Sequence, residues 1–277
     1  MKQRFNLLTL ALSLVAGLTM TSCLNSESDP TVQASPVVKV CWDSVEWLPY
    51  FETIDGKRID PTEESYNASI SQGMNWNNLI GKIIQLQYSY NSESPDVVIT
   101  DNGISGVTLI GYYDMNSAVE VVETAGAPND SISNMPIISV GEDNYNGSSI
   151  KAQYWGEQTL FVPINYFIGS LEHKFTLEYH PYEENLPNDG TLRLYLEHNK
   201  EKDSPMQQST SWNYALYGYS FLYYRAFNLA KIENYLQRQG QTMPISVTIV
   251  TREDDYSMEL KDETPTNEYV VTYGSEE

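Results

Sequence analysis

The chain contains few of the residues on which much protein chemistry depends. Its 277 residues include two cysteines, three histidines and 16 lysines and arginines, against 37 aspartates and glutamates. The resulting net charge of −21 repels nucleic acids and anionic lipid headgroups, because phosphate binding needs a positive field. The composition therefore excludes nucleic acid as a partner.

Sequence motifs of catalysis and cofactor binding are also missing. The chain has no HExxH, no GxSxG elbow, no phosphate loop and no Gly-rich dinucleotide turn. Acidic residues occur throughout, so no pair of carboxylates for glycoside hydrolysis stands out. We therefore predict that the protein is not an enzyme, with no catalytic residue and no cofactor.

No residues are spaced as metal ligands. His173 and His180 lie seven residues apart and would point to opposite faces of one strand, so we interpret them, with His198, as solvated or structurally bonded. The stretch EDNYNG (142–147) imitates a calcium loop, but its twelfth position is Gln153 and its flanks resemble strands, which favours a turn. We predict no metal site.

Long apolar runs are absent except near the start of the chain. Lys2 and Arg4 precede an uncharged apolar stretch from residue 7 to 20, which has the length of a secretory signal core. The sequence Met-Thr-Ser-Cys that follows resembles the processing site of Gram-negative lipoproteins. We predict a signal peptide over 1–22, lipidation at Cys23 and an outer-membrane protein of a Gram-negative cell that faces the periplasm or the surface. Three acyl chains would anchor it to the membrane essentially permanently.

Processing would leave about 255 residues with a net charge of −23, since Lys2 and Arg4 are removed from a chain of charge −21. Cys41 would be the remaining thiol, so no intrachain disulfide could form. Residues 23–36 are rich in Ser, Asp, Glu and Pro and are predicted to be a flexible tether.

Short apolar or alternating runs then follow one another, separated by turn residues. About five such runs fall within 37–127, with an Asp-Gly turn signal at 55–56. They are VVKVCW (37–42), the segment around DGKRIDP (55–61), LIGKIIQLQYSY (79–90), GVTLIGYYDM (106–115) and AVEVVET (118–124), the last two as a strand pair. This count predicts a small OB-like β-barrel domain over 37–127.

A second domain is predicted after the small-residue stretch AGAPNDS (125–131). Eight further strand-like runs over 133–277 favour an antiparallel β-sandwich. One helical pattern, LAKIENYLQRQG (229–240), interrupts them and ends at Gly240. The expected fold class is mainly β: a barrel, then a sandwich with one short crossover helix.

This layout resembles the NigD-like lipoprotein family. The most specific stretches are NDSISNMPIISV (129–140), EHKFTLEY (172–179) and LRLYLEHN (192–199). The resemblance implies an OB-type N-terminal domain and a C-terminal sandwich, and it implies no reaction or ligand. Residues 62–78 and 91–103 are longer than this resemblance leads us to expect.

A tyrosine-rich stretch, STSWNYALYGYSFLYYRAF (209–227), is the most suggestive candidate for binding. It is either a core strand or an exposed aromatic platform. The candidate ligand-binding residues are Trp212, Tyr214, Tyr217, Tyr219 and Tyr223. We predict a monomeric, lipid-anchored binding or accessory module for a glycan or an envelope protein. The alternatives are a fimbrial-type structural subunit and a glycan-directed hydrolase.

Overall fold

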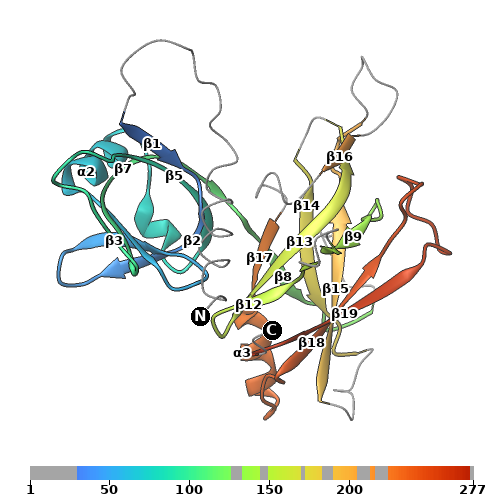
Figure 1. The fold of residues 1–277 in the computed structure, drawn as a ribbon. Coiled ribbons are helices and arrows are strands. Elements are labelled where there is room, and N and C mark those ends of the chain that lie inside the picture. Colours follow the sequence, from blue (N-terminus) through green and yellow to red (C-terminus); the bar gives the residue numbers. More distant parts are fainter. Residues whose placement is uncertain are drawn as a thin grey trace, which may run out of the picture. The chain divides into compact units, whose positions relative to one another are not determined.

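The computed structural model describes residues 30–125, 133–143, 149–169, 172–182, 190–204, 213–215 and 224–274. The chain separates into two compact units, Met1–Met115 and Asn116–Glu277 (Figure 1). The predicted fold class is confirmed: the protein is mainly β, with a closed five-strand barrel in the first unit. The second unit is a nearly closed, barrel-like sheet.

The first unit closes its sheet by pairing β5 with β7. Its strands are β1 (Thr31–Ala34), β2 (Val37–Asp43), β3 (Leu48–Glu52), β4 (Arg58–Pro61), β5 (Ile83–Asn91), β6 (Val98–Thr100) and β7 (Gly103–Asp114). They are ordered β1-β5-β2-β3-β4-β7-β6, and the β5–β7 pairing makes a ring of β5, β2, β3, β4 and β7. β4 runs parallel to β7, and the other pairs in the ring are antiparallel.

Alternation of apolar residues explains the barrel strands. Val38, Val40, Phe51 and Ile59 are at most 3% exposed and face the interior, so their neighbours face outward. The Asp-Gly signal forms the turn between β3 and β4, where Gly56 adopts a φ of 77°. The predicted hairpin is present at this turn.

A short helix that the sequence did not indicate packs on the barrel. Helix α2 (Glu63–Ser71) begins after Thr62, whose side chain accepts a hydrogen bond from Ser65 N, and a 3-10 turn, η2 (Trp76–Leu79), follows it. The buried residues of α2 are serines rather than apolar residues, so no apolar period marks it in the sequence.

Two predictions about domain limits are corrected. Residues 31–34 of the predicted tether form β1, which pairs with the long strand β5. The run at 118–124, expected to pair with β7 in the barrel, contains most of β8 (Asn116–Val121), which pairs with β14 and β17 in the second unit. Val119 contributes to the core of that unit, which explains where β8 is placed. Of the predicted boundary stretch, residues 126–131 lie outside the described residues.

The second unit is built on a ten-stranded sheet. Its strands, with the separate pair β10 and β11, are β8, β9 (Ser139–Val140), β10 (Glu142–Asp143), β11 (Ser149–Ile150), β12 (Gln153–Trp155), β13 (Thr159–Ile168), β14 (Lys174–Tyr179), β15 (Thr191–Asn199), β16 (Asn213–Ala215), β17 (Tyr224–Asn228), β18 (Ser246–Arg252) and β19 (Thr266–Thr272). The main path is β12-β13-β17-β8-β14-β15-β18-β19, and β9 and β16 also pair with β13. β8 is parallel to β14 and β17, and β15 is parallel to β18, so this sheet is mixed rather than purely antiparallel.

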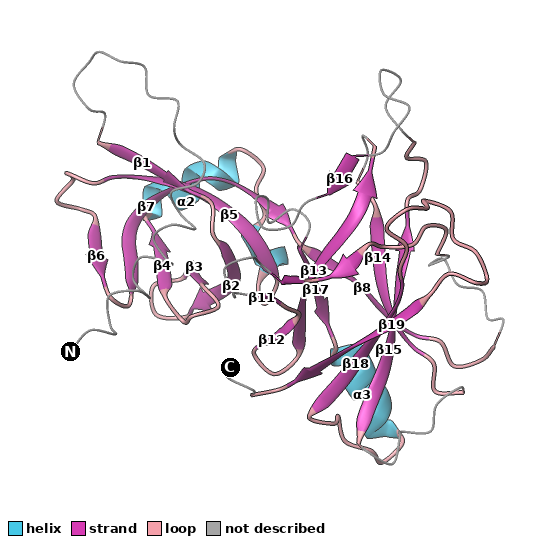
Figure 2. Ribbon diagram, turned by 45° about the vertical axis from the view of Figure 1, so that its right-hand side comes forward, coloured by secondary structure: helices cyan, strands magenta, loops and turns pink. Residues whose placement is uncertain are grey.

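The expected crossover helix is present as α3 (Ala230–Arg238), coloured cyan beside the sheet in Figure 2. Ile232 and Leu236 are fully buried in the core of the second unit, and Gly240, with φ 72°, follows the last turn. The calcium-like stretch lies partly outside the described residues; its first two residues form β10, which pairs with β11.

Candidate functional site

Most of the residues predicted to bind a ligand or to carry a lipid lie outside the part of the chain that the structure describes. They are Cys23, Trp212, Tyr217, Tyr219 and Tyr223. Tyr214 is described by its backbone in β16, where it pairs with Phe167. The next described residue of that stretch, Tyr224, is buried and stacks on Phe161 with ring centroids 4.8 Å apart.

The outer face of β2, β3 and β4 in the barrel carries an arginine stacked on a tyrosine. The guanidinium carbon of Arg58 lies 4.1 Å from the centroid of the Tyr50 ring. Arg58 also donates to Asp43 Oδ2 at 2.9 Å and to Asp60 Oδ1 at 2.7 Å. Its planar fork suits such carboxylate contacts, so these residues hold one another in place.

The loop between β2 and β3 presents two apolar side chains to solvent. Trp47 is 72% exposed and Val45 is 85% exposed. Asp43 Oδ1 accepts hydrogen bonds from the backbone N–H groups of Val45 at 2.8 Å and Glu46 at 3.2 Å, and Asp43 O accepts one from Trp47 N at 2.9 Å. Trp47 has a φ of 59°, which is costly for a bulky residue.

Asp43 therefore supports both the loop and Arg58. The hydrogen bond from Arg58, and then those from the N–H groups of Val45 and Glu46, hold the pKa of Asp43 below its usual value. We call Trp47, Tyr50 and Arg58, with the two aspartates that bind Arg58, the barrel face. Its aromatic rings and paired charges make it a preorganised surface without an excess of positive charge.

In the second unit, two histidines and an aspartate form a buried chain of hydrogen bonds. His173 Nδ1 lies 2.8 Å from His198 Nε2, and His173 Nε2 lies 2.8 Å from Asp203 Oδ2. At the other end, His198 Nδ1 lies 3.1 Å from the carbonyl oxygen of Pro136. The side chains of His173 and Asp203 are fully buried, and His198 is 1% exposed.

Aromatic rings enclose this chain. Phe175 stacks on His198 with centroids 4.6 Å apart and an interplanar angle of 12°. Tyr166 lies 5.1 Å from His173 and 5.3 Å from His198, between ring centroids. Phe175 and Tyr166 also belong to the apolar core of the second unit, so the chain of hydrogen bonds lies directly against that core.

Asp203 also joins two loops through its carboxylate. Its Oδ2 accepts from Gly169 N at 2.7 Å, and its Oδ1 accepts from Ser204 N at 2.9 Å. Residue 169 must be glycine, because a Cβ there would lie 2.0 Å from the carbonyl oxygen of Ser204.

The three stretches that carry the family resemblance converge on this chain. His173 and Phe175 come from EHKFTLEY, and His198 comes from LRLYLEHN. The stretch NDSISNMPIISV provides Pro136 and also Asn134, whose backbone N donates to His198 O at 3.0 Å. The most distinctive parts of the sequence therefore build one buried cluster.

Burial determines how the imidazoles of this chain titrate. Desolvation lowers the pKa of His198 to about 3. Desolvation also lowers the pKa of His173, whereas its hydrogen bond to Asp203 raises it. His198 is therefore neutral at physiological pH.

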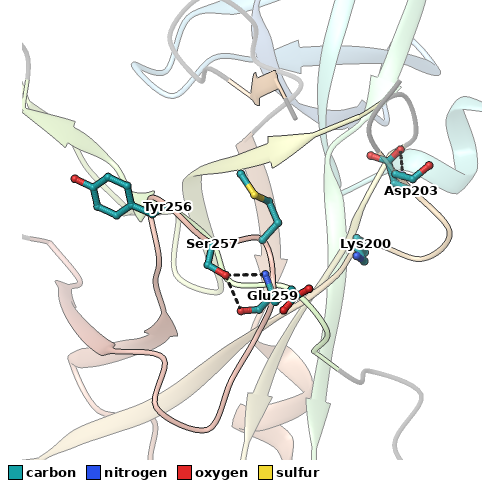
Figure 3. A pocket seen from close by; sticks show the side chains of 7 residues that line it. Lys200, Asp203, Tyr256, Ser257 and Glu259 are labelled. Carbon is teal, nitrogen blue, oxygen red and sulfur yellow. Dashed lines mark hydrogen bonds between the residues drawn. The ribbon is translucent and has the colours of Figure 1, made fainter. Parts of the chain in front are cut away.

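An open pocket of about 430 Å³ lies beside Asp203. It is lined by Lys200, Asp203, Ser204, Tyr256, Ser257, Met258 and Glu259. Figure 3 shows Ser257 and Glu259 between Tyr256 on one side and Lys200 and Asp203 on the other, with the Tyr256 ring pointing away from them. Both carboxylate oxygens of Asp203 are hydrogen-bonded, Oδ2 to His173 Nε2 and Gly169 N and Oδ1 to Ser204 N.

The third histidine has a separate environment on the opposite face of the sheet. His180 Nε2 lies 2.9 Å from Glu178 Oε2. The ring of His180 stacks between Tyr195, at a centroid distance of 4.7 Å, and Tyr182, at 5.6 Å. It is thus structurally bonded, which is one of the two environments that the sequence suggested.

Within the described residues, no three His, Cys, Asp or Glu side chains are arranged to hold a metal ion. No helix in the described ranges has the length and apolar character needed to cross a membrane.

Sequence reasoning missed the two clusters described above. Asp203 lies in the loop NKEKDS among other charged residues, and nothing in its spacing marks it as a partner of His173. Trp47 follows β2 in a stretch with a single aspartate as turn signal. The available clue in the sequence was a tryptophan that closely follows this aspartate.

Comparison with known proteins finds similarity in solved structures. No protein-family model and no curated protein matches the chain. A crystal structure described as a lipoprotein of Bacteroides fragilis has a TM-score of 0.60 at 20% identity and covers 88% of this chain and 100% of that chain. A NigD-like immunity protein of Bacteroides caccae has a TM-score of 0.45 at 12% identity and covers 88% of this chain and 93% of that chain. The Bacteroides fragilis protein shares the fold over most of the chain.

Proposed function

We propose that this chain is a lipoprotein of the outer membrane that acts as a binding module without catalysis. The apolar run followed by Met20, Thr21, Ser22 and Cys23 supports the lipid anchor. A protein described as a lipoprotein also matches this chain over its own full length at the level of the fold, which supports the same proposal.

The anchor is tested by replacing Cys23 with Ala. The protein should then move from the membrane fraction to the soluble fraction, because three acyl chains hold it and one alone binds only marginally. Cys41→Ala is the matched control, since it removes the chain's other thiol and should leave the protein in the membrane. Unchanged fractionation of Cys23→Ala, together with an N-terminal peptide that carries no lipid mass, would refute the anchor.

We propose that the barrel face binds a glycan. The observation that carries this proposal is Trp47, 72% exposed on a loop that Asp43 holds in place. OB-like barrels bind oligosaccharides on their second and third strands and on the loop between their first two strands. In the ring of this chain these are β3, β4 and the loop between β2 and β3. Trp47 offers an aromatic face for a sugar ring, and the aspartates offer acceptors for hydroxyl groups.

A screen of neutral polysaccharides, read by tryptophan fluorescence and direct binding, tests this surface. Trp47→Ala should weaken binding at least tenfold, as expected for loss of an aromatic anchor. Tyr256→Ala is the control, because that ring is 87% exposed but belongs to the second unit. Binding that survives Trp47→Ala and is lost in Trp212→Ala/Tyr214→Ala would place the ligand on the predicted tyrosine-rich platform instead.

A further inference from the structure

We infer that His173, His198 and Asp203 together hold one proton more than two neutral imidazoles and a carboxylate, so that the buried trio is electrically neutral. The inference rests on which atoms face one another along the chain of hydrogen bonds. It is independent of the proposed ligand and of the membrane anchor.

The carbonyl oxygen of Pro136 fixes the first hydrogen. A carbonyl oxygen accepts and does not donate, so the His198 Nδ1 that lies 3.1 Å from it must carry a hydrogen. The second contact, between His173 Nδ1 and His198 Nε2 at 2.8 Å, also needs one hydrogen. The third, between His173 Nε2 and Asp203 Oδ2, needs another.

Three contacts thus require three hydrogens, whereas two neutral imidazoles supply two. With two hydrogens, one contact would bring two lone pairs together at 2.8–3.1 Å between buried groups. An unmade hydrogen bond of this kind is costly, and the trio would also carry a buried negative charge. A third proton removes both penalties.

The additional proton lies between His173 and Asp203. His198 is neutral and uses its hydrogen on Pro136, so its Nε2 accepts from His173 Nδ1. His173 Nε2 and Asp203 Oδ2 then share the third hydrogen. Burial lowers the pKa of His173 as a single imidazole, but the pair is neutral with the proton and charged without it, so burial favours the protonated pair.

The charged groups around the trio come from several elements. Arg225 of β17 and Lys200 after β15 both oppose a positive charge on His173. Arg225 is offset by Glu172, which accepts from its Nη2 at 3.1 Å. Tyr166 of β13 contributes an aromatic ring against both histidines.

This proton count predicts a stability maximum near pH 6.5. Above that pH, unfolded histidines are neutral, so the folded trio binds about one proton more and stability falls as pH rises. Below it, the unfolded chain binds more protons, because both histidines charge, and stability falls as pH decreases. A trio with two hydrogens would instead gain stability as pH rises through 6.5 and then level off.

Nuclear magnetic resonance of the purified full-length protein tests the count directly. The chain has three histidines, so ¹⁵N-histidine spectra are simple to assign, and His180 is an internal reference. At pH 7.5 we expect His198 with hydrogen on Nδ1 alone, and either a doubly protonated His173 or a protonated Asp203 carboxyl in the ¹³C spectrum. A singly protonated His173 beside an ionised Asp203 would overturn the inference.

A second measurement uses the alkaline side of the stability profile. Between pH 7.5 and 9, the unfolding constant of the second unit, followed by amide signals of β14 and β15 in urea, should rise close to tenfold per pH unit. Asp203→Asn removes the carboxylate that shares the third hydrogen, so this rise should disappear. His180→Gln should keep the rise. Titration of the Cys41 thiol in this pH range affects all variants alike, because each of them contains it. A rise of equal size in Asp203→Asn would contradict the shared proton.

Discussion

At the scale of single residues, small polar side chains allow α2 to pack closely against the barrel. Ser65 Oγ accepts from Leu109 N of β7 at 2.6 Å. Ser69 Oγ accepts from the indole N–H of Trp76 at 2.7 Å and donates to Tyr66 O at 2.7 Å. Trp76 is 1% exposed and contacts Phe51 edge-on, so Ser69 provides the hydrogen-bond partner of a fully buried indole.

Replacing Ser69 with Ala should lower the free energy of unfolding of the barrel by about 1–3 kcal/mol, because the buried indole N–H loses its acceptor. Ser71→Ala is the matched control on the same helix. Ser71 is exposed and bonds Asn67 O, so its replacement should change stability by less than about 0.5 kcal/mol. Urea unfolding followed by tryptophan fluorescence measures both, and equal effects would show that Ser69 has no special role.

At the scale of elements, β8 determines where the second unit begins. It lies between β17 and β14, so it is an interior strand of that sheet, although it directly follows the last barrel strand. A sheet that loses an interior strand exposes two edges and opens its core.

We therefore expect a fragment of residues 116–277 to fold and one of residues 133–277 to remain unfolded or aggregate. The two fragments differ by residues 116–132, and β8 is the strand that the structure describes in that segment. Circular dichroism and dispersion of amide signals compare them, with the fragment 30–115 expected to fold as the barrel. A cooperatively folded 133–277 would show that β8 is dispensable and that the limit predicted from the sequence is the better one.

The sequence predicted strands better than it predicted their partners. Alternation marks β14 and β15 clearly, and both form. The meeting of His173 with His198, 25 residues apart, depends on the register that sets Phe175 opposite His198, and alternation alone does not determine register. For β8 the strand was predicted correctly and its partner wrongly, because Val119 suits either core. Helix α2 was missed because it buries serines.

At the scale of the whole molecule, net charge favours a monomer, and so do the short edge strands of the barrel unit. A net charge of −21 makes copies of the chain repel one another. The edge strands of the barrel unit, β1 and β6, are four and three residues long, which leaves little backbone for pairing between molecules.

Light scattering coupled to size exclusion should give the mass of one chain in about 0.1 M salt. High salt screens the repulsion, so any association should appear there first. A fimbrial-type subunit would behave differently and form ladders that resist dilution. Ladders in low salt would favour that alternative over a binding module.

On the export route proposed above, the position of β8 also sets the order in which the two units can complete their sheets. All barrel strands precede residue 115, so the barrel is complete in sequence early. β8 then emerges next, but its partners arrive roughly 60 residues later in β14 and 110 residues later in β17. During that interval β8 has two unpaired edges that can associate with other chains. If the proposed export is correct, loss of a periplasmic holding chaperone should therefore harm the second unit first, while the barrel still forms.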